Sequence, residues 1–117
     1  MHLVQFGVIE RLPFNVVGYL TALAAARAGT PQAGSPLLAN NTIDPTPFIP
    51  AGAVGTPVLA SEKGWKDTLQ MHPGEITRIR AKFDLKTNFS APQDYVFHCH
   101  ILEHESNSMM RPFRVIA

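Results

Sequence analysis

The stretch Tyr95-Val-Phe-His-Cys-His-Ile-Leu-Glu-His-Glu105 contains three of the chain's five histidines and its only cysteine. Its first half, up to Cys99, alternates in the manner of a β-strand. If the alternation continues to His100, His98 and His100 point to one side of the strand and Cys99 points to the other. We therefore predict that one strand end contributes ligands to two metal sites.

A second spacing joins Cys99 to His104 and Met109, which follow the pattern Cys-x4-His-x4-Met. A thiolate, an imidazole and a thioether on one loop are typical of blue-copper electron-transfer sites, where two imidazoles and a thiolate form a plane and a methionine sulfur is the weak axial ligand. A structural zinc site and a buried cysteine with satisfied histidines are the alternatives, although zinc has no need of a methionine. Because Met110 points away from Met109, we expect it to belong to the core.

The rest of the chain predicts a mainly antiparallel β fold with about five strands and one short helix. Asn15 is placed to cap a helix through Val16 to Arg27, and Gly29 is placed to end it. Six prolines between residues 30 and 60 predict a long surface loop, either a wall of a substrate pocket or a mobile insert. The predicted strands cover residues 2–10, 67–71, 76–83, 94–99 and 111–116, with a turn over 72–75 between the second and third.

Composition limits the partners and the domain count. The formal net charge is +1, and the basic residues are scattered, so a nucleic-acid partner is not expected. No apolar run is long enough to span a membrane, and 117 residues suffice for one domain or part of one. The single cysteine excludes an intrachain disulfide, which leaves Cys99 as a small buried residue, a reactive thiol or a metal ligand.

Together these stretches resemble the C-terminal copper signature of multicopper oxidases, most closely the branch of bacterial spore-coat laccases and bilirubin oxidases. The match covers most of the chain except the loop from about Gly29 to Ala60. The segments that carry it are Tyr95–Glu105, Met109–Pro112, Glu62–Thr68, Pro73–Glu75 and His2–Phe6.

The resemblance implies a cupredoxin-like Greek-key barrel that spans residues 1–117, and it implies copper ligands. Cys99 and His104 would lie in the plane of a type 1 copper, with Met109 axial, while His98 and His100 would bind the two type 3 coppers. The complete enzyme would pass single electrons from a phenolic or tetrapyrrole donor to O2, which is reduced to water. A closed barrel needs roughly seven or eight strands, so we expect this one to be incomplete.

Four other residues receive weaker interpretations. By the same resemblance, His2 would be a further type 3 ligand, although a disordered terminal histidine is the alternative. Glu105 would help to deliver protons to the cluster, with a solvated loop glutamate as the alternative. Asp67 is either structural or part of a substrate pocket, and His72, in a Pro-Gly turn, is expected at the surface.

The chain also departs from the family pattern. A type 1 and a type 2 histidine precede the position of His2 in the family motif, and further His-x-His pairs come from other cupredoxin domains. We therefore expect an internal start at Met1, missing N-terminal domains as partners, and an isolated chain that is inactive. The family suggests an extracytoplasmic or spore-coat location. An electron-transfer cupredoxin that is not an enzyme, with His72 as second imidazole, and an inactive fragment remain alternatives.

Overall fold

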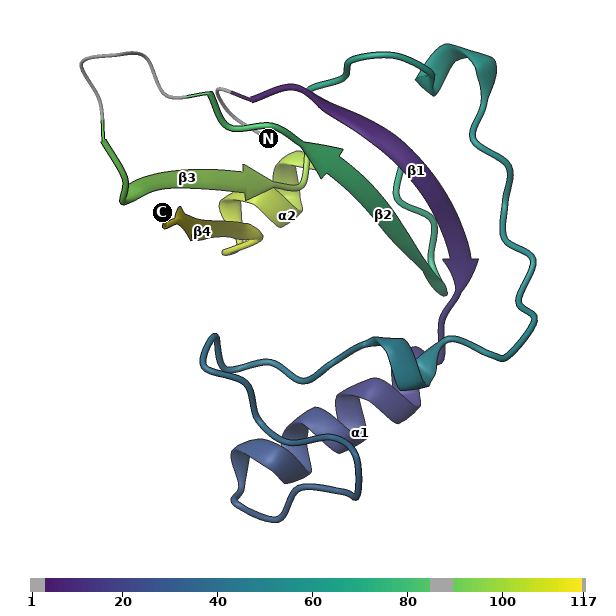
Figure 1. Ribbon diagram of the computed structural model, residues 1–117, viewed down its shortest axis with the longest axis vertical. Helices are drawn as coiled ribbons and strands as arrows, with labels where there is room; N and C mark the ends of the chain where they lie inside the picture. The colour runs from purple at the N-terminus through teal and green to yellow at the C-terminus, as the bar shows by residue number, and fades with distance from the viewer. Residues whose placement is uncertain (1–3, 85–89, 117) are drawn as a thin grey trace. The chain divides into compact units, whose positions relative to one another are not determined.

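The computed structural model describes residues 4–84 and 90–116, so the prediction for His2 lies outside the described residues. They form two compact units, one made from residues within 1–9, 59–70 and 79–117 and the other from 10–58 and 71–78. The elements in chain order are β1 (Phe6–Pro13), α1 (Val16–Arg27), the 3-10 helices η1 (Thr46–Phe48) and η2 (Ala60–Glu62), β2 (Glu75–Ala81), β3 (Gln93–His98), α2 (Leu102–Ser106) and β4 (Met110–Val115) (Figure 1).

Helix α1 has the bounds that the sequence predicts. Its N-terminus is capped by the Asn15 side chain, whose Oδ1 accepts a hydrogen bond from the Gly18 N–H at 2.9 Å. At its other end Gly29 has a left-handed backbone (φ 80°), and the Thr30 N–H bonds back to the Ala25 carbonyl at 3.0 Å. These features are those of a Schellman motif, in which a left-handed residue ends the helix.

The proline-rich stretch after α1 contributes to the core of its unit. Ile43 is 1% exposed and packs with the buried residues of α1, and Phe48 lies against Tyr19 with ring centroids 5.5 Å apart. Phe14 completes an aromatic trio with these two rings. The expected loop is thus fastened to α1 by apolar contacts that its composition did not reveal.

The predicted strand over 67–71 is wrong, and so is its predicted pairing with the strand that follows. Strand β2 pairs with β1 instead, and the two run side by side in opposite directions (Figure 1). Lys66 makes a single bridge to Phe6, with an N–H to carbonyl distance of 2.8 Å in each direction. Beyond this single bridge, the backbone after Lys66 forms no ladder with β1 or β2 in the part of the chain described.

Strands β3 and β4 lie within one residue of their predicted positions and pair antiparallel, from Gln93 opposite Val115 to His98 opposite Met110. Tyr95 and Phe113, which are directly opposite each other, stack with ring centroids 5.5 Å apart. Phe83 packs edge-on against both rings. Cross-strand aromatic pairs of this kind stabilise an antiparallel ladder, and they fix the strand end that carries His98.

The described residues thus contain four strands in two small sheets rather than the expected five or so, and these strands close no barrel. They also contain the helix α2 and two 3-10 turns beyond the one predicted helix. In the part of the chain described, every helix is too short or too polar to cross a membrane.

Candidate metal centre

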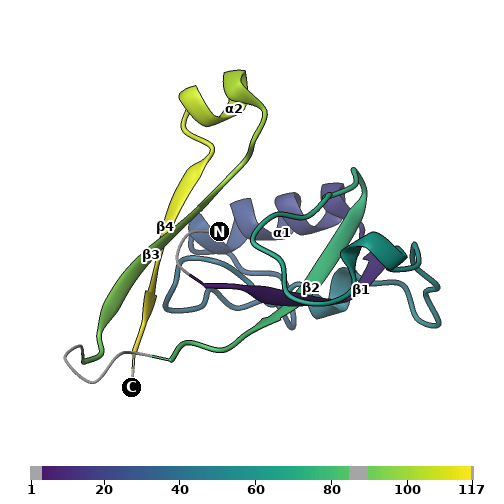
Figure 2. The same ribbon diagram turned by 90° about the horizontal axis from the view of Figure 1, so that it is seen from above.

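The predicted ligands sit at the end of the β3–β4 ladder, where α2 connects the two strands (Figure 2). His98 is the last residue of β3, and Cys99 and His100 follow it directly. Helix α2 begins at Leu102 and carries His104 and Glu105. The sequence did not predict this helix. Its five residues turn the chain so that His104 lies close to Cys99, at the end of β3.

Cys99 and His104 form the first cluster. The Cys99 Sγ lies 3.8 Å from the His104 Nδ1, and the Ile101 N–H points to the same sulfur at 3.5 Å. Taking bonds of about 2.3 Å to sulfur and about 2.0 Å to nitrogen, as in zinc sites, two ligands that subtend about 120° lie about 3.7 Å apart. The observed separation is therefore short enough for a thiolate and an imidazole to share one metal ion.

Met109 is held beside this cluster by its backbone. Its carbonyl accepts a hydrogen bond from the Cys99 N–H at 3.1 Å, and its own N–H donates to the His104 carbonyl at 3.0 Å. The residue is 50% exposed. All three predicted type 1 ligands are thus joined by main-chain hydrogen bonds before any metal is considered.

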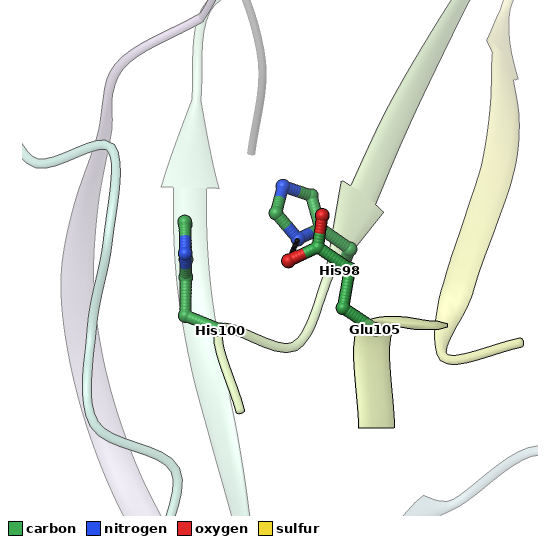
Figure 3. Close-up of side chains that lie close together, drawn as sticks. All are labelled: His98, His100 and Glu105. Atoms are coloured by element: carbon green, nitrogen blue, oxygen red, sulfur yellow. Dashed lines mark ion pairs between the residues drawn. The ribbon is translucent and has the colours of Figure 1, made fainter. Parts of the chain in front are cut away.

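His98, His100 and Glu105 form the second cluster (Figure 3). The two imidazole rings have centroids 4.6 Å apart, and the three potential ligand atoms lie within 4.8 Å of one another. The His98 Nδ1 lies 3.0 Å from the Cys99 carbonyl oxygen and 3.4 Å from the Glu105 Oε2. Both neighbours favour the tautomer with the proton on Nδ1, in which Nε2 carries the lone pair that a metal requires.

The structure disagrees with one prediction for a neighbouring residue. Met110 was expected in the core, but it is 42% exposed at the end of the β3–β4 ladder, opposite His98. His72 is partly exposed, as expected, and its Nδ1 lies 3.1 Å from the Glu75 Oε2. Asp67 is exposed and is not among the residues that line the surface pocket formed by Trp65, Phe83, Tyr95 and their neighbours.

One residue of the metal centre was missed in the sequence. Ser108 precedes Met109 and has a left-handed backbone with φ 72°. Serine rarely adopts this conformation, which glycine or asparagine usually supplies. The sequence therefore contained no signal for the turn that reverses the chain between α2 and β4.

Comparison with known proteins identifies the chain. The multicopper oxidase family model matches residues 1–117. The chain is 36% identical to a laccase of Bacillus subtilis and 38% identical to a laccase of Bacillus stratosphericus, over 98% and 99% of this chain and 17% of each laccase. It is also 52% identical to a multicopper oxidase of Arabidopsis thaliana, in an alignment of 68 residues that covers about half of this chain and 12% of that oxidase. The chain therefore belongs to the multicopper oxidase family, as a cupredoxin-type C-terminal domain homologous to the bacterial laccases.

Proposed function

We propose that the chain is part of a laccase-like oxidase that couples the one-electron oxidation of phenolic or tetrapyrrole donors to the reduction of O2 to water. Within that enzyme Cys99, His104 and Met109 would hold the type 1 copper, and His98 and His100 would bind the type 3 coppers. His2 is proposed as a further type 3 ligand on the resemblance alone. The family membership and the similarity to two laccases support this proposal.

The observation that carries the proposal is the division of three consecutive residues between two clusters. The Cys99 thiol faces His104, while its neighbours His98 and His100 face each other and Glu105. A metal held by the first cluster and a metal held by the second would be separated by a few covalent bonds of one strand end. Copper in such sites supplies one-electron redox chemistry, and the Cys99 to His98 and His100 connection is the route that we propose for the electrons.

The alternative of a simple electron carrier does not use the second cluster. A mononuclear site needs a thiolate, two imidazoles and an axial ligand. His98 and His100 have no place in such a site, yet their rings lie together, and the His98 side chain is only 5% exposed. A buried imidazole beside a second one and a carboxylate is better explained as part of a further metal site.

The chain spans 17% of the length of the two Bacillus laccases, so the complete sites require more polypeptide. We propose that the segment that precedes His2 in the family motif supplies the second type 1 imidazole and a type 2 histidine, and that other cupredoxin domains supply the remaining histidines of the cluster. We also propose that the remaining strands of a Greek-key barrel complete the two small sheets. O2 and a small reducing substrate would be the other partners.

The proposal is tested in the copper-loaded full-length oxidase with two single substitutions. Cys99→Ser should abolish the intense blue absorption of a thiolate–copper site, because the ligand that produces it is gone. His98→Ala should keep that absorption but lower the copper content and stop O2 consumption. If the wild-type protein bound a single copper and consumed no O2, and His98→Ala left that copper content unchanged, the chain would instead belong to an electron carrier.

A further inference from the structure

Ser108 is one of two non-glycine residues with a left-handed backbone among the described residues, the other being Asn41. It follows Asn107, which caps the C-terminus of α2. Residues in this position of a helix end usually are glycine because a side chain in the left-handed region meets the backbone. Serine is therefore held there by the structure on either side of it.

The hydrogen bonds around Ser108 show what its conformation achieves. The Met109 N–H bonds back to the His104 carbonyl, which is the longer of the two bonds of a Schellman motif. The Met109 carbonyl then accepts the Cys99 N–H, which extends the β3–β4 ladder by one residue beyond the pair of His98 and Met110. Both bonds require the chain to reverse direction at Ser108.

Helix α1 provides an internal comparison. It ends in the same motif, with the Thr30 N–H bonded to the Ala25 carbonyl and with Gly29 at φ 80° in the left-handed position. No predicted copper ligand lies in that motif. The two helix ends thus share a left-handed residue and the long backward hydrogen bond, and only at the end of α2 does that hydrogen bond join two predicted copper ligands, Met109 and His104.

We propose that Ser108 is a positioning residue whose left-handed backbone sets Met109 against Cys99 and His104 and so fixes the axial ligand of the copper site. The role rests on the proposed function, because Met109 is an axial ligand only if copper binds here. Ser108 itself has no contact with the metal in this role. It acts through the two main-chain hydrogen bonds of Met109.

A graded set of substitutions in the copper-loaded full-length oxidase tests the role. Ser108→Gly and Ser108→Asn can adopt a left-handed backbone and should keep the wild-type blue absorption and reduction potential. Ser108→Val should shift both, because a β-branched side chain is tolerated in the left-handed region far less well than serine. If this additional strain is on the order of the free energy of a tenfold change, copper binding should weaken by about tenfold. Gly29→Val is the matched control, because it places a valine in the left-handed position at the end of α1 and adds at least as much strain there.

The control separates a positioning role from general destabilisation. We expect Gly29→Val to lower the melting temperature but to leave the blue absorption and the potential of the remaining folded enzyme unchanged. The role is overturned if Ser108→Val retains the wild-type spectrum and potential. It is also overturned if Gly29→Val alters them as much as Ser108→Val does.

Hydrogen exchange on the copper-free protein provides a readout that does not depend on the metal. Ser108→Val should lose protection at the Cys99 and Met109 amides, and Ser108→Asn should keep it. If the wild-type oxidase showed no blue absorption but Ser108→Val lost this protection, the proposed function would fail and the backbone role of Ser108 would stand. If the Cys99 and Met109 amides were equally protected from exchange in all the variants, the positioning role of Ser108 would be excluded, irrespective of copper binding.

Discussion

Glu105 is the carboxylate that groups with the paired histidines among the described residues. Its Oε2 lies 3.4 Å from the His98 Nδ1, and its side chain is 32% exposed. A partly exposed carboxylate beside a buried imidazole can exchange protons with water and also hold the ring in one orientation. Glu103 lies in the same short helix and is exposed, which makes it a natural comparison.

We predict that Glu105→Gln slows O2 reduction by the full-length oxidase by about a hundredfold, a typical contribution of a general acid. The blue absorption should be retained, because Glu105 is not in the Cys99 cluster. Glu103→Gln is the control and should leave both properties unchanged. Steady-state O2 consumption and the absorption spectrum are the measurements, and equal rates for the two variants would exclude a proton-donating role for Glu105.

Gly55 is the position where the backbone leaves the least room. A Cβ atom added there would lie 1.4 Å from the carbonyl oxygen of Arg11 and 2.9 Å from the Cα of Leu12. The chain therefore crosses strand β1 at van der Waals distance of its backbone, which only glycine permits. By contrast, a Cβ atom added at Gly7, which lies within β1, would have no atom within 4 Å.

We predict that Gly55→Ala destabilises the protein by about 3 kcal/mol, at the upper end of the cost of overpacking, because main-chain atoms cannot move aside as a side chain can. Gly7→Ala should change the free energy of unfolding by less than about 1 kcal/mol. Denaturant unfolding of both variants measures the difference. Similar midpoints for the two variants would mean that the Gly55 crossing relaxes without cost.

At the scale of elements, a carboxylate fastens the proline-rich stretch to strand β2. Glu75, the first residue of β2, accepts hydrogen bonds from the Thr56 hydroxyl and from the Thr56 N–H, the latter at 3.3 Å. His72 contacts the other oxygen of the same carboxylate at 3.1 Å. The hydrogen bonds from Thr56, and to a smaller extent the hydrogen bond and charge of His72, lower the pKa of Glu75 below its usual value against the opposing effect of burial.

A lowered pKa in the folded state means that this contact stabilises the protein above the pKa of the unfolded chain and is lost as the pH falls through the folded value. We therefore predict that hydrogen exchange near Thr56, corrected for the intrinsic pH dependence, rises as the pH falls through the lowered pKa of Glu75. Glu75→Gln, which has no proton to gain, should show little of this rise. Asp44→Asn is the control, since the pKa of Asp44 is also lowered, by hydrogen bonds from Thr46.

The outcome is decided by comparing the three proteins over the same pH range. A rise that is present in the wild type and in Asp44→Asn, but absent in Glu75→Gln, assigns the pH dependence to the contact with Thr56. An identical rise in Glu75→Gln would assign it to other carboxylates. The exposed pair of Asp94 and Arg114 on β3 and β4, with side chains 60% and 62% exposed, is expected to contribute little in either case.

For the whole molecule, the predicted copper ligands among the described residues all belong to one of the two units. A metal that binds the folded state alone stabilises that state, by about 2.7 kcal/mol when its free concentration is a hundred times its dissociation constant. The stabilisation by the metal should be local. The predicted ligands lie in or next to β3, α2 and β4, which belong to one unit, whereas α1 belongs to the other.

We predict that removal of copper with a chelator lowers the melting temperature of the full-length oxidase and raises hydrogen exchange in β3, α2 and β4 more than in α1. Cys99→Ser should show a smaller change on chelation, because one of its sites is already lost. Calorimetry and hydrogen exchange of the holo and apo proteins are the measurements. An exchange pattern that did not differ between α1 and the β3–β4 region would contradict the local effect.

The sequence by itself determined the family, the cluster of predicted copper ligands and the local elements whose signals are short in range. Helix α1 was predictable because its cap, its terminating glycine and its apolar residues all lie within a few positions of one another. Strands β3 and β4 were predictable within one residue because their own alternation and aromatic residues favour a strand. The spacing of Cys99, His104 and Met109 indicated the type of metal from the chemistry of the donors alone.

Only the tertiary structure decided which strands pair and how the ligand loop turns. The strand predicted over 67–71 was expected to pair with the segment that follows it, but that segment, β2, pairs with β1. This is a choice between distant segments that no local pattern encodes. Likewise, Ser108 has no intrinsic preference for a left-handed backbone, and Gly55 looks like any loop glycine. Their conformations follow from hydrogen bonds and close approaches between segments far apart in the chain, which exist only once those segments have packed together.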